Sequence, residues 1–244
     1  MVNLSDQNTF ELMSYSLGNT SKGHIIYQQD DLFIAHEQLF QNATPTRFYH
    51  NQADTFVFIV KGELYLQQKT QQNALAVEKE TVLKTHQGIW LAAHTISNIT
   101  LLTPMVELCL IRLKPTRHVE ENELFQKVSS GTVELIPGRN HIKTWPLWQG
   151  PSGKIVLEFY PPQYKETLYY QKTATQYLLP LNGIAFISNG KKPPEVCSML
   201  GRIITKQERR AILNPSSKSI TLLSVMTAQQ SKGRILVLTN HKAR

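Results

Sequence analysis

The chain has 244 residues, 41% of them hydrophobic, and a formal net charge of +8 at pH 7 with histidine neutral. That length allows one large domain or two of ordinary size, each able to bury a hydrophobic core without a disulfide or metal staple. The N-terminus lacks the basic start and apolar core of a signal peptide, and no apolar run approaches about 18 residues. The sequence therefore predicts a soluble cytoplasmic protein and no membrane partner.

The positive charge is concentrated in the second half of the chain. Residues 1–121 contain 9 Lys/Arg and 12 Asp/Glu, whereas residues 122–244 contain 17 and 6. Such asymmetry is typical of proteins with an anionic partner, such as a phosphate, a carboxylate-rich ligand or nucleic acid. It also serves solubility, and the composition leaves both interpretations open.

Short runs of valine, isoleucine, leucine and aromatic residues alternate with turn residues along the chain, as in residues 48–62 and 106–113. Helical periodicity is confined to short stretches such as residues 120–128. The sequence therefore predicts an all-β protein. The two cysteines, Cys109 and Cys197, are expected to be buried free thiols, because Cys109 lies in an apolar run and free cysteine is usually buried.

The chain repeats itself without a gap at an offset of 121 residues, over about 70 positions. Most apolar positions stay apolar although few residues are identical, so the repeat predicts two copies of one β fold. Gly62 and Gly183 are expected at equivalent turns. The aligned segments are 48–62 with 169–183, 81–91 with 202–212 and Ile99–Leu102 with Ile220–Leu223, and the upstream pairs are Ile34 with Ile155 and Glu37 with Glu158.

Proline and glycine residues cluster in residues 116–150, which is typical of a linker with short elements. The predicted organisation is a first domain over residues 1–115, a linker over residues 116–135 and a second domain over residues 136–244.

The first repeat contains fragments of two motifs. His50 precedes a predicted strand that ends at Gly62. His94-x3-Asn98 lies after another predicted strand and before Ile99–Leu102. These residues resemble the cupin family, whose first motif is G-x5-H-x-H-x(3,4)-E-x6-G and whose second contains P-x-G-x2-H-x3-N. The resemblance covers most of the chain and implies two tandem cupin-like (jelly-roll) β-barrels with a short linker.

In that family, histidines and a carboxylate point into the barrel and hold one divalent metal. Here Phe48 replaces the first histidine and Thr55 replaces the glutamate. Asp54 is a substitute, because four residues along a strand return to the face of His50. The resemblance thus implies a site for Fe, Mn, Ni or Zn in the first barrel, with His50, His94 and Asp54 as ligands and Gln52 as a further candidate.

The second repeat keeps no histidine at the family positions, which fall on Tyr169, Gln171, Thr175 or Gln176, and Pro215. A metal is therefore not expected in this barrel, whose role is structural, dimer-forming or ligand-gating. Its tyrosines are expected to line a pocket or to pack as half-buried strand residues. They are Tyr160, Tyr164, Tyr169, Tyr170 and Tyr177.

Residues 204–208 and 214–220 also resemble the helix-turn-helix of cyclic-AMP-receptor-type transcription regulators, which carry a β-barrel sensor. Arg209 and Arg210 stand where the first helix needs an apolar and a small residue. Prolines also interrupt residues 141–185, where the long dimerisation helix would lie. The strand interpretation is favoured, and nucleic acid is disfavoured as a partner.

The cupin resemblance implies a protein that binds a small-molecule ligand, but the fold alone leaves the chemistry open. One hypothesis is a mononuclear-metal-dependent oxygenase or isomerase, a dioxygenase-like oxidoreductase, in which the metal of the first barrel is the Lewis acid or oxygen-binding centre. The alternative is a metal-free bicupin that binds a ligand or partner without catalysis. We also expect a homodimer or an intramolecular face-to-face arrangement of the barrels, because exposed sheet faces and edges commonly pair.

Overall fold

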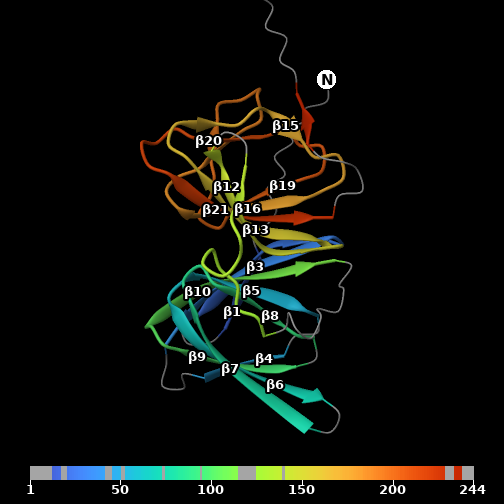
Figure 1. Ribbon diagram of the computed structural model, residues 1–244, viewed down its shortest axis with the longest axis vertical. Coiled ribbons are helices and arrows are strands. Elements are labelled where there is room, and N and C mark those ends of the chain that lie inside the picture. Colours follow the sequence, from blue (N-terminus) through green and yellow to red (C-terminus); the bar gives the residue numbers. More distant parts are fainter. Residues whose placement is uncertain are drawn as a thin grey trace, which may run out of the picture.

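The computed structural model describes residues 13–17, 21–41, 46–50, 53–72, 75–93, 95–114, 125–138, 141–228 and 234–237. The regular structure in these ranges is almost entirely β, as the sequence predicts, and no helix in them has the length and apolar character needed to cross a membrane. The strands form two groups that are stacked along the long axis of the molecule (Figure 1).

The first group is a barrel of two facing sheets. Its six-stranded sheet contains, in spatial order, β1 (Met13–Ser16), β2 (Lys22–Gln28), β3 (Leu32–Phe40), β10 (Met105–Leu113), β5 (Thr55–Lys61) and β8 (Gly88–Leu91). Its four-stranded sheet contains β4 (Thr46–His50), β9 (Ile96–Leu101), β6 (Glu63–Gln72) and β7 (Leu75–Lys84). Aliphatic side chains from both sheets, such as Leu39, Leu66 and Ile99, form the core between them.

The second group repeats this plan. Its six-stranded sheet contains β11 (Ile136–Pro137), β12 (Lys143–Gly150), β13 (Gly153–Tyr160), β21 (Ile220–Thr227), β16 (Gln176–Asn182) and β19 (Arg202–Ile204). A four-stranded sheet contains β14 (Tyr164–Lys165), β20 (Ala211–Asn214), β17 (Phe186–Ser188) and β18 (Glu195–Val196). A two-stranded sheet pairs β15 (Tyr169–Tyr170) with β22 (Ile235–Leu236). The all-β, two-barrel prediction is confirmed.

The two six-stranded sheets face each other across the centre of the molecule (Figure 1). Phe58 and Trp90 of the first barrel and Leu223 of the second belong to one buried cluster between them. The rings of Trp90 and Trp148 meet edge to face across this boundary, with centroids 5.2 Å apart. Of the two arrangements expected from the sequence, the intramolecular face-to-face one is therefore present, and a homodimer stays a prediction.

The register confirms the repeat in the first part of each copy. β5 and β16 begin 121 residues apart, at Thr55 and Gln176. The glycines that follow these strands, Gly62 and Gly183, have φ of 89° and 68°. Both are in the left-handed region that glycine adopts at little cost, which is why the repeat keeps glycine at this turn.

The offset is shorter in the second part of each copy. Trp90 of β8 pairs with Phe56, and Ile203 of β19 pairs with Tyr177, so these strands are 113 residues apart. The hairpin after the turn glycine explains the change, because β6 and β7 have 10 residues each whereas β17 has 3 and β18 has 2. The gap-free alignment beyond this turn is therefore wrong, since it superposes β9 on β21, which belong to different kinds of sheet.

The segment that resembles a helix-turn-helix is not helical. Residues 202–227 form β19, β20 and β21 with turns between them. The DNA-binding alternative is therefore wrong for the residues that suggested it. The prediction for the cysteines is confirmed, because Cys109 and Cys197 are both buried and free.

A buried hydrogen bond joins the two barrels at their facing sheets. Nε2 of His36 on β3 lies 2.5 Å from the hydroxyl of Tyr177 on β16. That hydroxyl donates to the carbonyl of Leu200 at 2.9 Å, so its oxygen accepts from His36. Burial lowers the pKa of His36 to about 4, and the nearby His24 adds to this effect. His36 is therefore neutral in the folded protein at physiological pH.

This pKa predicts a pH-dependent stability. In the unfolded chain, His36 takes up a proton at about pH 6.5, whereas in the folded protein it stays neutral down to about pH 4. The stability that neutral His36 contributes above pH 6.5 is therefore lost as the pH falls from 6.5 through 4. We expect the loss to be on the order of 3 kcal/mol, measured by urea unfolding between pH 7 and pH 4. Since carboxylates also titrate in this range, the measurement is the difference from His36→Gln, which should lack this component. Identical pH profiles for the two proteins would contradict the assignment.

Candidate functional site

The inner surface of the second barrel carries both apolar and polar side chains. Leu178 and Leu222 belong to its apolar cluster. Glu158, Gln176 and Ser224 point to the same side of the sheet and are almost completely buried. Gln176 Nε2 donates to Ser224 Oγ at 2.6 Å. A polar compartment thus lies inside this barrel.

Arg210 is the central charge of this compartment, with 0% of its surface exposed. Its Nη2 donates to the hydroxyl of Tyr169 at 2.5 Å, and its Cζ lies 4.5 Å from the centroid of that ring. In the described part of the chain, Nε and Nη1 of Arg210 have no hydrogen-bond partner. Among the described residues with a buried, unpartnered side-chain nitrogen or oxygen, Arg210 is the only charged one. Each unmet buried donor costs about 1–3 kcal/mol, so a bound acceptor would gain most here.

A second arginine and a glutamate flank Tyr169. Glu166 is buried, and its Oε1 accepts from Arg234 Nη1 at 2.7 Å while its Oε2 accepts from the N–H of Ile212 at 2.9 Å. The guanidinium of Arg234 lies 4.4 Å from the centroid of the Tyr169 ring. Burial raises the pKa of Glu166, and the nearby Arg234 and the Ile212 N–H partly offset that rise. Both acceptor oxygens of Glu166 are therefore already engaged within the protein.

The tyrosines predicted to line a pocket divide into two groups. The hydroxyl of Tyr160 donates to Glu158 Oε2 at 2.9 Å inside the barrel. Burial raises the pKa of Tyr164 and of Tyr169 to about 12 and raises that of Tyr160 well above its ordinary value, so all three keep their protons. Tyr177 instead faces the first barrel, because it occupies the alternate face of β16.

Sequence spacing places Arg210 at the histidine position of the second cupin motif. Gln207, Arg210 and Asn214 have the spacing of G-x2-H-x3-N, and Gln207 has a φ of 66°, which glycine favours. Ile212 of β20 pairs with Ile187 as Ile99 of β9 pairs with Leu66, so β9 and β20 are also 113 residues apart.

This register corrects the position expected from the sequence. The expected equivalent, Pro215, is wrong because the shorter hairpin shifts the alignment by several residues. The same offset makes Ser97 of the first barrel, rather than His94, the equivalent of Arg210.

The metal ligands predicted in the first barrel are only partly described. His50 ends β4 with its backbone opposite Ile96, and its side chain lies outside the described part, as do His94 and Gln52. Asp54 lies between β4 and β5 rather than on one strand with His50, so strand alternation does not relate their side chains. Its Oδ1 accepts from the N–H of Ala93 at 2.7 Å.

Among the described residues, no three of His, Cys, Asp or Glu are grouped so that they could hold a metal ion. The assignment of His50, His94 and Asp54 to a metal stays a prediction.

The residues of the second barrel do not fit the metal of the family. The ligand positions hold Tyr169, Gln171, Gln176 and Arg210. An arginine keeps its positive charge at every accessible pH and repels a divalent cation. A protonated tyrosine and two amides are weak ligands beside the imidazole and carboxylate donors that such metals prefer. This donor set favours an anion instead.

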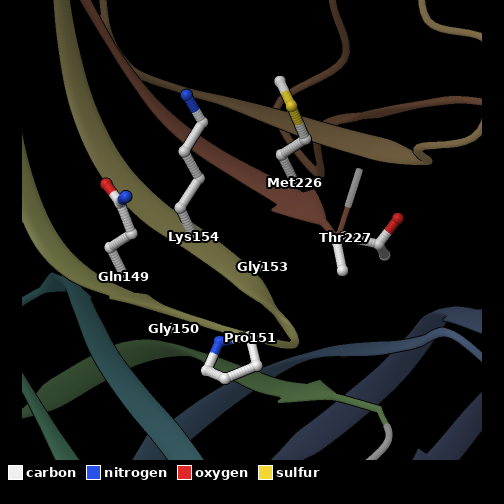
Figure 2. A pocket seen from close by; sticks show the side chains of 8 residues that line it. Gln149, Gly150, Pro151, Gly153, Lys154, Met226 and Thr227 are labelled. Carbon is white, nitrogen blue, oxygen red and sulfur yellow. The ribbon is translucent and has the colours of Figure 1, made fainter. Parts of the chain in front are cut away.

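Figure 2 shows a depression around the β12–β13 hairpin, where β13 begins and β21 ends. Lys154 and Met226 are cross-strand partners there, and Lys154 lies on the same face of β13 as Glu158. Met226 Sδ accepts from Gln171 Nε2 at 3.6 Å. Lys154 and Met226 both line the depression, and Met226 is the one that contacts the inner residue Gln171.

No protein-family model and no curated protein matches the sequence. Solved structures match the fold instead. Vicilin from hazelnut (Corylus avellana) has a TM-score of 0.67 at 8% identity, over 92% of this chain and 86% of that one. Oxalate decarboxylase from Bacillus subtilis, described with Mn(II) centres, has a TM-score of 0.64 at 7% identity, over 93% and 78%. A cupin 2 conserved barrel domain protein from Leptotrichia buccalis has a TM-score of 0.61 at 11% identity, over 88% and 92%.

These likenesses, together with the repeated two-sheet plan, show that the chain has a cupin-like fold. More particularly, it has two domains of that fold in tandem. At 7–11% identity the neighbours show the fold and not the chemistry.

The two arginines are expected to differ in their effect on stability. Arg234→Met leaves the Glu166 carboxylate buried without its charged partner, and we expect a loss of about 2 kcal/mol, less than for a fully buried pair because the Arg234 side chain is 39% exposed. Arg210→Met removes unmet donors and should change stability by no more than about 1 kcal/mol. Urea unfolding at pH 7 measures both, and a loss above about 3 kcal/mol for Arg210→Met would assign that residue a structural role.

Proposed function

We propose that this protein is a metal-free bicupin that binds a small molecule on the polar inner surface of its second barrel. The observation that carries the proposal is Arg210, a fully buried guanidinium with unpartnered Nε and Nη1 at the histidine position of the second motif. Keeping such a group lowers stability, and natural proteins retain costly polar groups mainly at functional sites. Met226 lines an external depression and accepts from Gln171 of the inner surface, and we place the entry of the ligand there.

The surrounding groups support binding rather than catalysis. Tyr160, Tyr164 and Tyr169 keep their protons, because burial raises the pKa of each. Glu166 is held by Arg234 and a backbone N–H. Hydrogen-bond donors that are fixed before the ligand arrives give affinity and orientation, whereas catalysis needs a group that can accept or deliver a proton.

The first barrel supports this proposal through packing. Its core is aliphatic, and two of its inner polar pairs are bonded within the protein: Tyr15 donates to Glu37 Oε1 at 2.7 Å, and Arg112 Nε donates to Thr55 Oγ1 at 2.9 Å. Its outer sheet forms half of the buried cluster between the barrels. In this proposal, the first barrel stabilises the fold of the second barrel by packing against its six-stranded sheet.

The competing proposal is a mononuclear-metal-dependent oxygenase or isomerase in the first barrel, with Fe, Mn, Ni or Zn held by His50, His94 and Asp54. Its support is the family motif and the Mn(II) centres named for the B. subtilis oxalate decarboxylase. The engaged carboxylate of Asp54 is its weakest element, because one of its oxygens already accepts from Ala93. A cytoplasmic location and a homodimer are further proposals, and light scattering after size exclusion tests the dimer.

Metal analysis separates the two proposals. We expect elemental mass spectrometry of protein purified without chelator to find far less than one transition-metal ion per chain, and dialysis against EDTA to leave the Tm unchanged. One ion per chain that disappears in both His50→Ala and His94→Ala, but persists in the matched second-barrel variant Gln171→Ala, would favour the metal enzyme.

Ligand binding tests the proposal itself. A thermal-shift screen of small metabolites should yield compounds that raise the Tm of the wild-type protein, since a ligand stabilises the state that it binds. The shift should vanish in Arg210→Gln and persist in Arg209→Gln, because Arg209 is the exposed neighbour of the same charge. A shift that persists in Arg210→Gln would place the site elsewhere.

A further inference from the structure

The unpartnered groups of the second barrel specify the chemistry of its ligand. We propose that this barrel binds a small monocarboxylate that also carries a hydroxyl or amino group, with the carboxylate on Arg210 and the second group on Gln176. This inference rests on the proposed function and deepens it. It uses two unpartnered groups of opposite kind, a donor and an acceptor, on one inner surface.

The donor is the guanidinium of Arg210. Its Nη2 is used by Tyr169, whereas Nε and Nη1 have no acceptor. Each edge of the planar fork contains one of these free nitrogens, and each edge matches the spacing of two carboxylate oxygens. A carboxylate on one edge accepts from one of these free nitrogens and from the remaining N–H of Nη2, and it neutralises the charge, whereas a neutral carbonyl leaves the charge in place.

The charges around Arg210 favour a single negative charge on the ligand. Arg234 is paired with Glu166, and Glu158 accepts from Tyr160. These two carboxylates lie in the same compartment as Arg210, so a second negative charge on the ligand would be repelled at low dielectric. Lys154, which lines the external depression beside Met226, adds a positive charge that attracts anions to this surface. A monocarboxylate is thus favoured over a phosphate dianion.

The acceptor is the side-chain oxygen of Gln176. This residue is 1% exposed, its Nε2 donates to Ser224, and its Oε1 has no partner. Contacts connect it to Arg210 along the inner surface: Gln176 pairs with Met226 across strands, Met226 accepts from Gln171, and Gln171 lies two residues after Tyr169. A ligand that has both a carboxylate and a hydroxyl or amino donor can satisfy both ends of this row.

The carboxylate is enclosed when it is bound, because Arg210 has no exposed surface. The smallest hydroxy- and amino-carboxylates, glycolate, lactate and glycine, are therefore the probes that test the ligand class.

Isothermal titration at constant ionic strength and pH 7 tests the ligand class. The probes are glycolate, lactate, glycine, acetate, acetamide and inorganic phosphate. We expect at least one of glycolate, lactate and glycine to bind more tightly than acetate. Acetamide should bind at least about 10-fold more weakly than acetate by the loss of a charge-assisted hydrogen bond, and phosphate at least about 10-fold more weakly because the two nearby carboxylates repel its second negative charge. Binding of acetamide or phosphate as tightly as acetate, or no binding of any carboxylate, would overturn the inference.

Variants assign the two anchors. Arg210→Gln should weaken acetate binding about 100-fold, and Arg210→Lys, which keeps the charge and loses the fork, should recover only part of it. Gln176→Met should leave acetate binding unchanged and remove the advantage of the hydroxy- or amino-carboxylate. Arg209→Gln is the matched control and should bind as the wild type does. Circular dichroism checks that each variant is folded, and an unaltered affinity in folded Arg210→Gln would overturn the assignment.

Failure of this inference is distinguishable from failure of the proposed function. If screened neutral compounds bind the second barrel while no carboxylate binds, the ligand class is wrong and the binding function stands. If no small molecule raises the Tm and none titrates, both are wrong.

Discussion

The packing of the two six-stranded sheets against each other is the interaction on which the rest of this molecule depends. Each sheet gives one face to the other barrel, so polar groups on these strands are confined to the inner faces unless, like His36 and Tyr177, they bond across the boundary. The first barrel fills its inner face mainly with aliphatic side chains, whereas the second buries Arg210 there with unpartnered Nε and Nη1. This difference is the reason why the proposed function assigns ligand binding to the second barrel.

Within the second barrel, the backbone fixes Arg210 before any ligand arrives. Its N–H donates to the carbonyl of Tyr169 at 2.8 Å, and the N–H of Tyr169 donates back to Arg210 at 3.0 Å. This bridge holds the guanidinium against the ring, while Glu166 and Arg234 satisfy each other beside it. A preorganised donor with little freedom to lose is what a site for a small anion requires, because ordering side chains opposes binding.

Sequence reasoning predicted the all-β class, the two copies and the turn glycines, because strand alternation and left-handed turns leave local signals. It could not find Arg210, since one shortened hairpin shifts the register and assigns the histidine position to Pro215. It also could not separate Tyr169 from Tyr177, because strands buried on both faces carry no polar side that marks the core. The buried Glu158, aligned with Glu37, was the one signal of inner charge that the repeat contained.

The most direct test of this account is a crystal structure of the protein grown with Mn(II) and glycolate, with anomalous diffraction collected for manganese. We predict planar ligand density against the guanidinium of Arg210 and no anomalous peak inside the second barrel. An anomalous peak beside Tyr169 and Gln171, with Arg210 turned away from it, would contradict the account, because it would return the metal of the family to the position that we assign to an anion.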